Sequence, residues 1–407
     1  MIRSSKVSLK FANINKIDKL NDFIEEYKFI TQEFIDILWD LENTPKFIPK
    51  DITDRVKKET WLSARAIQSS AKQASGIVRG TKKKNEQRLY VWNQLNNEGK
   101  FKQARKLKRT IDSNPVGLPD IKTICPELDS RFVKIEMDSK TSFDGWITLT
   151  CLGNKLKIKV PFKRTSHFNH MLESGTLKEG VRLSNKSITF NFQIEDKLKK
   201  DSGITLGLDI GISKVFATSE KQLSKADIHG WNLTKIQHKL SRKHKGSKSF
   251  ERVQSHRKNF INWSLNQLNF NGVKTLKLEK IKNLRRNNKV SRFMSHWTYT
   301  DISRKLESLC EEHGVQTLYI SPTYTSQRCS KCGWVRKSNR KGDIFKCKSC
   351  GFTLDADLNA SFNISFDLPS ISKKKRLSRP NLKGFYWNEI SKEPIVPCAP
   401  ESISYSS

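Results

Sequence analysis

The sequence predicts a multidomain protein of α/β and α+β class, in which an antiparallel β-barrel with inserted helices precedes an α/β domain carrying a four-cysteine zinc ribbon. Between residues 132 and 194, apolar and polar side chains alternate with period two, which is typical of antiparallel strands. After residue 200, strands that end in carboxylates are separated by helical stretches, which favours an α/β fold. Two Cys-x-x-Cys pairs follow, and 407 residues are enough for two or three domains.

The chain is strongly basic, with 76 Lys and Arg against 41 Asp and Glu and a formal net charge of +35. These basic residues are spread over the whole length, so the excess suits a polyanionic partner, and nucleic acid is favoured over a membrane surface. Ribosomal and viral packaging proteins share this composition, so charge alone names no activity.

The expected location is intracellular, in the cytoplasm or nucleoid. The start of the chain lacks the apolar run of a signal peptide, and no apolar stretch reaches the length of a membrane span, so no membrane partner is expected. Four cysteines outside the paired motifs show no pairing pattern, which favours a reducing compartment. They are Cys125, Cys151, Cys310 and Cys398.

The barrel is predicted from its strands. Residues 7–11 alternate apolar and polar, so 1–12 is expected to supply the first strand of a barrel whose remainder lies in 115–200. The helices between these two stretches are then an insertion after the first strand. Four alternating segments separated by turns lie in the second stretch: 132–137, 145–152, 155–162 and 188–194.

The insertion, residues 13–114, is predicted to be helical because apolar residues recur every three or four positions. A first helix ends before Pro45, and a second over about 55–78 is ended by Gly80. A third helix, over about 82–111, is strongly basic. Its charged face is either a phosphate-binding surface or ordinary solvated surface.

Residues 201–325 begin the α/β domain. A buried strand over 204–208 ends on Asp209, and Gly211 opens the turn into a returning strand. A strand-end carboxylate beside a glycine turn is how ribonuclease-H-like folds present their first metal ligand. The alternative is an aspartate that only caps the turn.

A second strand, 273–278, ends on Glu279, and a helix over about 297–312 and a strand over 316–320 continue the alternation. Between the two carboxylate-bearing strands lies a long basic helical region, 231–268. Its candidate phosphate contacts are Lys243, Lys245, Lys248, Arg252, Arg257 and Lys258.

Residues 326–353 form the predicted zinc ribbon. Cys329 with Cys332, and Cys347 with Cys350, make two pairs, each followed directly by a glycine that turns backbone amides toward the thiolates. Four thiolates in two such pairs are typical of a tetrahedral, structural Zn²⁺ site. Two disulfides or four unligated cysteines are the alternatives.

A third acid, Asp357, opens a helical pattern in residues 354–368 and is placed comparably to Asp209 and Glu279. Carboxylates are the hard ligands that Mg²⁺ prefers. Two Mg²⁺ ions roughly 3.5–4 Å apart can activate a water and stabilise the leaving oxygen of a phosphodiester. No histidine cluster or serine motif nearby competes for the chemistry, so these acids are the candidate catalytic residues and Mg²⁺ ligands.

The motifs resemble those of a known family. The motifs are, in chain order, LGLDIGISKVFATS, the basic helix, LEKIKNL and TSQRCSKCG…CKSCG…DADLNASFNI. In identity and order they resemble the RuvC nuclease domain of TnpB proteins from transposons and of compact type V CRISPR effectors. The resemblance covers roughly residues 203–367. It implies that the catalytic acids are Asp209, Glu279 and Asp357, because the family pattern is D-x-N-A and Asp355 does not fit it.

The resemblance also implies a fold and an activity. A wedge barrel with a recognition insertion would hold a noncoding guide RNA, and the RuvC-like domain would cleave double-stranded target DNA beside a short flanking motif. The alternatives are a DNA-binding regulator without cleavage, RNA-guided or protein-only, and a guide-independent resolvase. A DDE-type transposase is disfavoured, since the ribbon placement follows the TnpB pattern.

Residues 369–407 are a basic tail that contacts nucleic acid, acts as a localisation signal or is only solvated.

Overall fold

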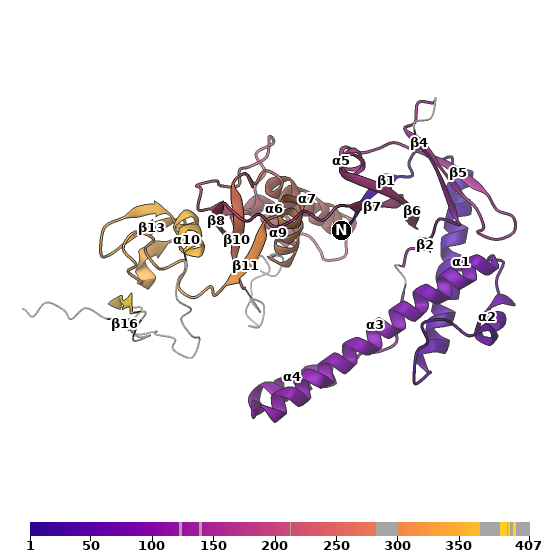
Figure 1. Cartoon of the computed structure of the whole chain (residues 1–407), viewed down its shortest axis with the longest axis horizontal. Coiled ribbons are helices and arrows are strands. Elements are labelled where there is room, and N and C mark those ends of the chain that lie inside the picture. Colours follow the sequence, from indigo (N-terminus) through magenta and orange to yellow (C-terminus); the bar gives the residue numbers. More distant parts are fainter. Residues whose placement is uncertain are drawn as a thin grey trace, which may run out of the picture. The chain divides into compact units, whose positions relative to one another are not determined.

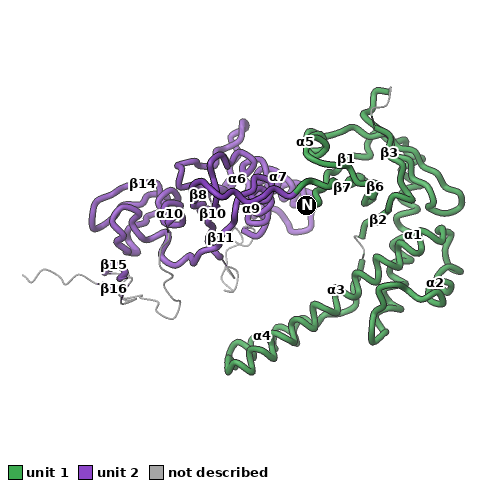
Figure 2. Tube along the Cα trace, in the orientation of Figure 1, with its two compact units in different colours: residues 1–195 green, residues 196–407 purple. Residues whose placement is uncertain are grey.

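The computed structural model describes residues 1–121, 124–137, 141–211, 213–281, 299–366, 383–388, 390 and 394–395. The chain divides into two compact units, residues 1–195 and 196–407, coloured separately in Figure 2. The basic run at 373–376 and the start of the helix expected from residue 297 lie outside the described residues.

The first unit holds two open antiparallel sheets (Figure 1). One has the strand order β1-β7-β6-β2 and the other the order β3-β4-β5. Within the described residues no strand pairing closes either sheet, so the predicted closed barrel is wrong. The strands are β1 Ile2–Ser8, β2 Glu127–Leu128, β3 Val133–Met137, β4 Gly145–Leu149, β5 Ile158–Phe162, β6 Gly175–Leu183 and β7 Ser187–Ile194.

The sequence correctly placed β3, β4, β5 and β7 but missed β6, in which only Val181 and Leu183 are buried and two glycines interrupt the alternation. Period-two alternation marks which face of a strand is buried, whereas pairing partners depend on contacts far apart in the chain. β6 pairs with β7 through a register shift between Leu177 and Val181. Such an irregularity bends a strand and breaks the even ladder that the barrel prediction assumed.

The helices of the first unit are α1 Ile14–Trp39, α2 Lys50–Lys57, α3 Ala64–Asn97, α4 Phe101–Ser113 and α5 Ser166–Ser174. Small buried residues of α3, including Ala71 and Ala74, let it pack closely against α1. The predicted break at Gly80 is wrong, because α3 continues to Asn97. One glycine costs a helix only about 1 kcal/mol relative to alanine, which the flanking helix formers outweigh.

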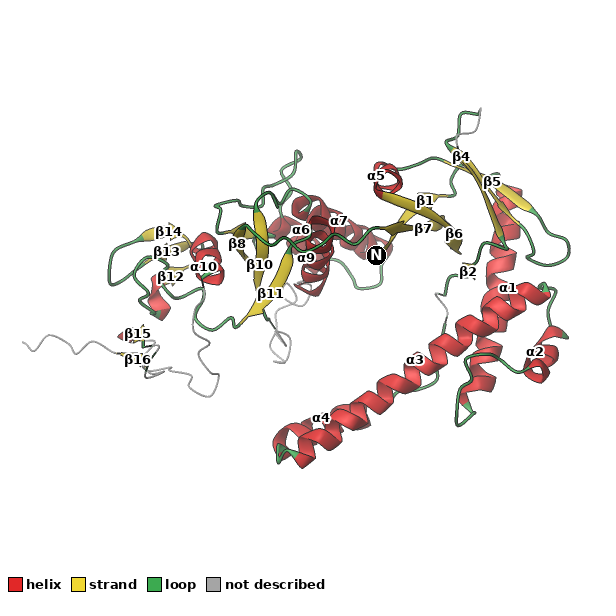
Figure 3. Ribbon diagram, in the orientation of Figure 1, coloured by secondary structure: helices red, strands yellow, loops and turns green. Residues whose placement is uncertain are grey.

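The second unit contains a four-stranded sheet of order β11-β10-β8-β9 (Figure 3). β10 Val273–Glu279 pairs in parallel with β8 Ile204–Asp209 and with β11 Gln316–Ile320, while the short β9 Ala217–Thr218 is antiparallel to β8. These bounds confirm the predicted strands at 204–208, 273–278 and 316–320.

The sheet carries helices on both faces. α6 Leu233–Ser241, α7 Lys248–Leu265 and α9 Tyr299–His313 share one apolar core with Leu206, Leu208, Leu276 and Leu278 of the strands. α10 Ala356–Ser365 packs on the other side of β8, where a Cβ on Gly207 would lie 2.2 Å from the Ser361 carbonyl oxygen. Gly207 therefore allows α10 to approach the strand backbone.

A three-stranded antiparallel sheet precedes α10: β12 Arg340–Lys341, β13 Ile344–Lys346 and β14 Thr353–Asp355, with the 3₁₀ turn η1 Lys337–Asn339 before it. A two-residue ladder joins β15 Tyr386–Trp387 to β16 Pro394–Ile395. No helix within the described ranges is long and apolar enough to cross a membrane.

Candidate functional site

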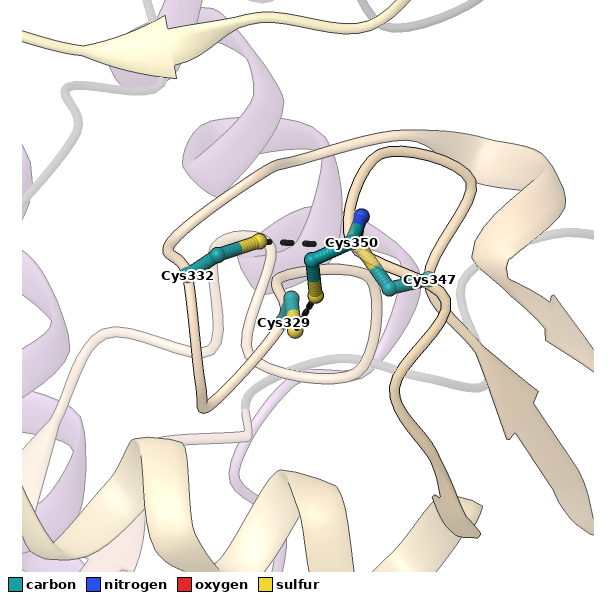
Figure 4. A group of neighbouring side chains, drawn as sticks. All are labelled: Cys329, Cys332, Cys347 and Cys350. Carbon is teal, nitrogen blue, oxygen red and sulfur yellow. Dashed lines mark hydrogen bonds between the residues drawn. The ribbon is translucent and has the colours of Figure 1, made fainter.

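The four predicted cysteines form one cluster (Figure 4). Their Sγ atoms all lie within 4.8 Å of one another. Cys329 Sγ is 3.8 Å from Cys350 Sγ, and Cys332 Sγ is 3.6 Å from Cys347 Sγ. Tetrahedral Zn²⁺ with Zn–S bonds of about 2.3 Å places its sulfurs roughly 3.8 Å apart. The donor set therefore fits a structural zinc ion, and the distances exclude disulfide bonds.

The turns around the cysteines have the predicted form. Gly333 and Gly351 adopt φ values of +79° and +73°, and their amides donate to the carbonyls of Cys329 and Cys347. The amides of Ser349 and Cys350 point at Cys347 Sγ at 3.4 and 3.5 Å. Such N–H groups stabilise a thiolate, which is the form that binds metal.

Asn339, which the sequence analysis missed, links the two cysteine turns. Its side chain is buried, and its Nδ2 donates to the carbonyls of Gln327 and Trp334 at 3.0 and 3.3 Å. Its Oδ1 accepts from the Lys348 amide at 3.0 Å. One amide thereby holds the backbone of both cysteine pairs, so the cluster is preorganised for its ion.

The three predicted acids meet at one end of the sheet. Asp209 ends β8 and Glu279 ends β10, and these neighbouring parallel strands pair Leu208 with Leu278 just before the acids. Asp357 lies in the first turn of α10, which packs on β8. Sequence alone placed Asp209 and Glu279 at strand ends, and their adjacency follows from the parallel pairing.

The electrostatics show that these carboxylates interact. Burial, followed by the negative charges of Glu279 and Asp357, raises the pKa of Asp209 well above its usual range. Burial also raises the pKa of Glu279, although a hydrogen bond from Thr325 and the charge of Arg340 oppose this shift. A buried carboxylate whose pKa is raised by two neighbouring acids favours a bound cation.

Two cations that the sequence did not single out reach Asp357. Arg340 Nη2 of the ribbon lies 2.9 Å from Asp357 Oδ1, and Lys214 Nζ lies 3.4 Å from Asp357 Oδ2. Arg340 also lowers the pKa of Asp209 and Glu279. It is one of many basic residues in its stretch, so no pattern in the sequence distinguishes it.

Asp355 has a different position from Asp357. It is the N-cap of α10, where its Oδ1 accepts from the amides of Asp357 and Leu358 at 3.0 and 3.2 Å. Its Oδ2 lies 2.7 Å from Lys214 Nζ. Asp355 therefore fixes both the helix start and a neighbouring cation.

The donor chemistry of the acid centre fits Mg²⁺, since buried carboxylate oxygens are hard ligands. Among the described residues, however, only the four cysteines form a group of three or more candidate ligands with all ligand atoms within 4.8 Å. Arg340 and Lys214 contact both carboxylate oxygens of Asp357. The assignment of Asp209, Glu279 and Asp357 as Mg²⁺ ligands stays a prediction.

The predicted basic helical region is two helices, α6 and α7. Of its candidate phosphate contacts, Arg257 is only 5% exposed and packs into the unit, so this residue is wrongly placed on the surface. An open cavity of about 620 Å³ lies along α7, lined by Lys248, Arg252, His256 and neighbours. Lys248 and Arg252, which line this cavity, are exposed, and exposed cations are what a polyanion-binding surface requires.

Comparison with known proteins identifies relatives of this site. Residues 299–364 match the family model described as Cas12f1-like, TNB domain. The CRISPR-associated endodeoxyribonuclease Cas12f1 of Sulfoacidibacillus thermotolerans is 44% identical over 103 residues, which are 25% of this chain and 24% of that protein. Over these stretches the chain is similar to proteins of the TnpB/Cas12f-like family.

Other TnpB/Cas12f-like relatives align over longer stretches. Cas12f1 of an uncultured archaeon is 28% identical over 46% of this chain and 43% of its own length. TnpB-like protein MJ0751 of Methanocaldococcus jannaschii is 24% identical over 57% of this chain and 82% of its own length. The chain therefore spans less than half the length of the Cas12f1 proteins it matches.

A solved structure of the Cas12f1-sgRNA-target DNA complex aligns over 90% of this chain at 15% identity, with a TM-score of 0.43. At that score the alignment by itself does not establish a shared fold.

Proposed function

We propose that this TnpB/Cas12f-like protein is an RNA-guided endonuclease that cleaves double-stranded DNA beside a short flanking motif. A noncoding guide RNA would select the target by base pairing, while the protein would bind the heteroduplex through its backbone. The observation that carries the proposal is the position of Asp209, Glu279 and Asp357 at one end of the sheet, where burial and the charges of Glu279 and Asp357 raise the pKa of Asp209. Relatives named as RNA-guided or CRISPR-associated DNA endonucleases support it.

The chemistry proposed for the acid centre is metal-assisted hydrolysis of a phosphodiester. Two Mg²⁺ ions held there would supply Lewis-acid activation of a water and stabilisation of the leaving oxygen. Asp209 and Glu279 would hold the ions from the strand ends, and Asp357 from the helix start. Arg340 would place a positive charge beside the scissile phosphate once it releases Asp357.

The proposed domain roles follow the resemblance. Residues 1–12 and 115–200 would form a wedge domain and 13–114 a recognition domain, both holding the guide RNA. Residues 201–325 and 354–368 would form the nuclease domain, with the zinc ribbon at 326–353 and a basic tail at 369–407. The net charge of +35 supports binding to RNA and DNA.

A second candidate is a DNA-binding regulator of the same ancestry that does not cleave. The ion pairs of Arg340 and Lys214 with both oxygens of Asp357 favour it, because they compete with metal ligation. Sequencing the RNA that copurifies with the protein, followed by cleavage assays in Mg²⁺, separates the candidates. The nuclease proposal expects only RNA-loaded protein to cut matched DNA. Equal cutting by RNA-free protein refutes guidance, and binding without cutting favours the regulator.

A further inference from the structure

Two asparagines on α10 hold the segment that enters the zinc ribbon. Asn359 and Asn363 are one helical turn apart and buried, with 0% and 1% exposure. Asn359 Nδ2 donates to the Arg328 carbonyl at 2.8 Å, and its Oδ1 accepts from the Ser330 amide at 3.0 Å. These two bonds bracket Cys329, the first zinc ligand.

Asn363 extends the same contact along the segment. Its Nδ2 donates to the carbonyls of Thr325 and Arg328 at 2.8 and 2.7 Å. Its Oδ1 is buried and has no hydrogen-bond partner. The buried amide thus contributes through its donor group, which serves two backbone carbonyls at once. We call residues 325–330 together with Asn359 and Asn363 the amide clamp.

The clamped segment also reaches the acid centre. The hydroxyl of Thr325 donates to Glu279 Oε1. The helix that carries the two asparagines also carries Asp357 in its first turn. The segment that carries Cys329 is therefore connected to Glu279 through Thr325, and to Asp357 through α10.

The clamp is costly to break. Without Asn363 the Thr325 carbonyl loses its amide donor, while the Arg328 carbonyl keeps Asn359 Nδ2. A buried carbonyl left without a donor destabilises the arrangement that held it. Groups that orient metal ligands in this indirect way commonly change metal affinity by about 10–100-fold when they are removed.

We propose that Asn359 and Asn363 are positioning residues that couple the zinc ribbon to the acid centre, so that zinc at the four cysteines raises Mg²⁺ affinity at Asp209, Glu279 and Asp357. The inference rests on the proposed function for the role of the acids. Coupling between two binding sites is reciprocal, so Mg²⁺ also tightens zinc binding.

The test is calorimetric titration of Mg²⁺ into the full chain, with Asp209→Ala giving the background of unspecific binding. Removing zinc from the wild type is expected to weaken specific Mg²⁺ binding about tenfold or more. Zinc-loaded Asn363→Ala is expected to show the same weakening while it retains one zinc per chain. Removing zinc from this variant is expected to have a smaller further effect than in the wild type, because the contact with Thr325 is lost while Asn359 still holds Arg328 and Ser330.

Ser361→Ala is the matched control. Ser361 lies between the two asparagines and is equally buried, but its hydroxyl donates only to Leu358 within α10. This variant is expected to bind Mg²⁺ within about twofold of the wild type and to keep the response to zinc. Thr325→Val removes only the hydroxyl that contacts Glu279, and it is expected to weaken Mg²⁺ binding without loss of zinc.

Unchanged Mg²⁺ affinity in zinc-free wild type overturns the inference, as does an Asn363→Ala variant that behaves like Ser361→Ala. If Asn363→Ala misfolds by circular dichroism, Thr325→Val decides, and wild-type affinity in that variant overturns the coupling. The outcome is distinguishable from that of the proposed function. If zinc raises Mg²⁺ affinity but the wild type does not cleave DNA, this inference stands and the nuclease proposal is refuted. If the wild type cleaves DNA but zinc has no effect on Mg²⁺ affinity, the nuclease proposal stands and this inference is refuted.

Discussion

Asp355 offers a quantitative test of how α10 is held at the acid centre. Asp355→Ala removes the N-cap that accepts from the amides of Asp357 and Leu358, and it also removes one of the two carboxylate partners of Lys214. Loss of such a cap costs about 1 kcal/mol, within a range of roughly 0.5–2. The ion pair is partly exposed, with side-chain exposures of 22% and 26%, so it adds at most about 1 kcal/mol.

Asp355→Asn separates the two contributions, because asparagine caps helices about as well as aspartate but carries no charge. Hydrogen exchange at the amides of Asp357 and Leu358 reports the local opening of the helix start. We expect Asp355→Ala to speed this exchange by about 5–30-fold, the factor that corresponds to about 1–2 kcal/mol. Asp355→Asn should stay within about fivefold of the wild type.

Two results would refute this reasoning. Wild-type exchange rates in Asp355→Ala would show that the cap contributes nothing, and equal acceleration in Asp355→Asn would assign the effect to the charge. On the proposed assignment of Asp357 as the third ligand, cleavage by Asp355→Ala should be only mildly reduced, since Asp355 caps α10. An inactive Asp355→Ala beside an active Asp357→Ala would mean that the third ligand is misassigned.

Three further predictions concern stability and zinc. Gly207→Ala should destabilise residues 196–407 by more than about 2 kcal/mol, because its Cβ would lie 2.2 Å from the Ser361 carbonyl oxygen. Gly76 lies in the middle of α3, and a Cβ there would meet nothing within 4 Å. Gly76→Ala should therefore raise the free energy of unfolding by about 0.5–1 kcal/mol, and urea titration of both variants gives the comparison. Burial, with the charge of Lys197, lowers the pKa of His313 in the folded chain. The unfolded chain therefore binds the proton more tightly, and the free energy of unfolding should fall as pH drops below about 6.5, the ordinary pKa of histidine. Thermal melts of His313→Gln should show a weaker dependence of melting temperature on pH, and an unchanged dependence would contradict this prediction. Cys347→Ser should reduce the zinc content of the purified chain, and one retained zinc per chain would contradict the structural assignment.

The elements around the acid centre were predictable because their signals are local. Strands β8 and β10 are short apolar runs bounded by turns, and each ends in a carboxylate. The cysteine pairs were predictable because ligand spacing and glycines are written directly in the sequence. Asp357 was separated from Asp355 by the family pattern, and the structure gives Asp355 a role as helix cap.

What the sequence could not supply depends on contacts between distant residues. Arg340 is one cation among several neighbours, and only the fold brings it to Asp357. Asn359 and Asn363 form a regular i, i+4 pair, but their partners lie 29 to 38 residues away along the chain. The four-stranded sheet of the first unit likewise depends on pairing between β1 and β7, which a strand pattern alone does not specify.

The most direct test of the proposed nuclease compares cutting with binding in single alanine variants of the three acids. Guide-programmed cleavage and gel-shift binding should be measured side by side in Mg²⁺ for Asp209→Ala, Glu279→Ala and Asp357→Ala. Each variant should lose cleavage and keep guide-directed binding, because affinity comes from base pairing and basic contacts elsewhere. Normal cleavage by all three variants would contradict the mechanism.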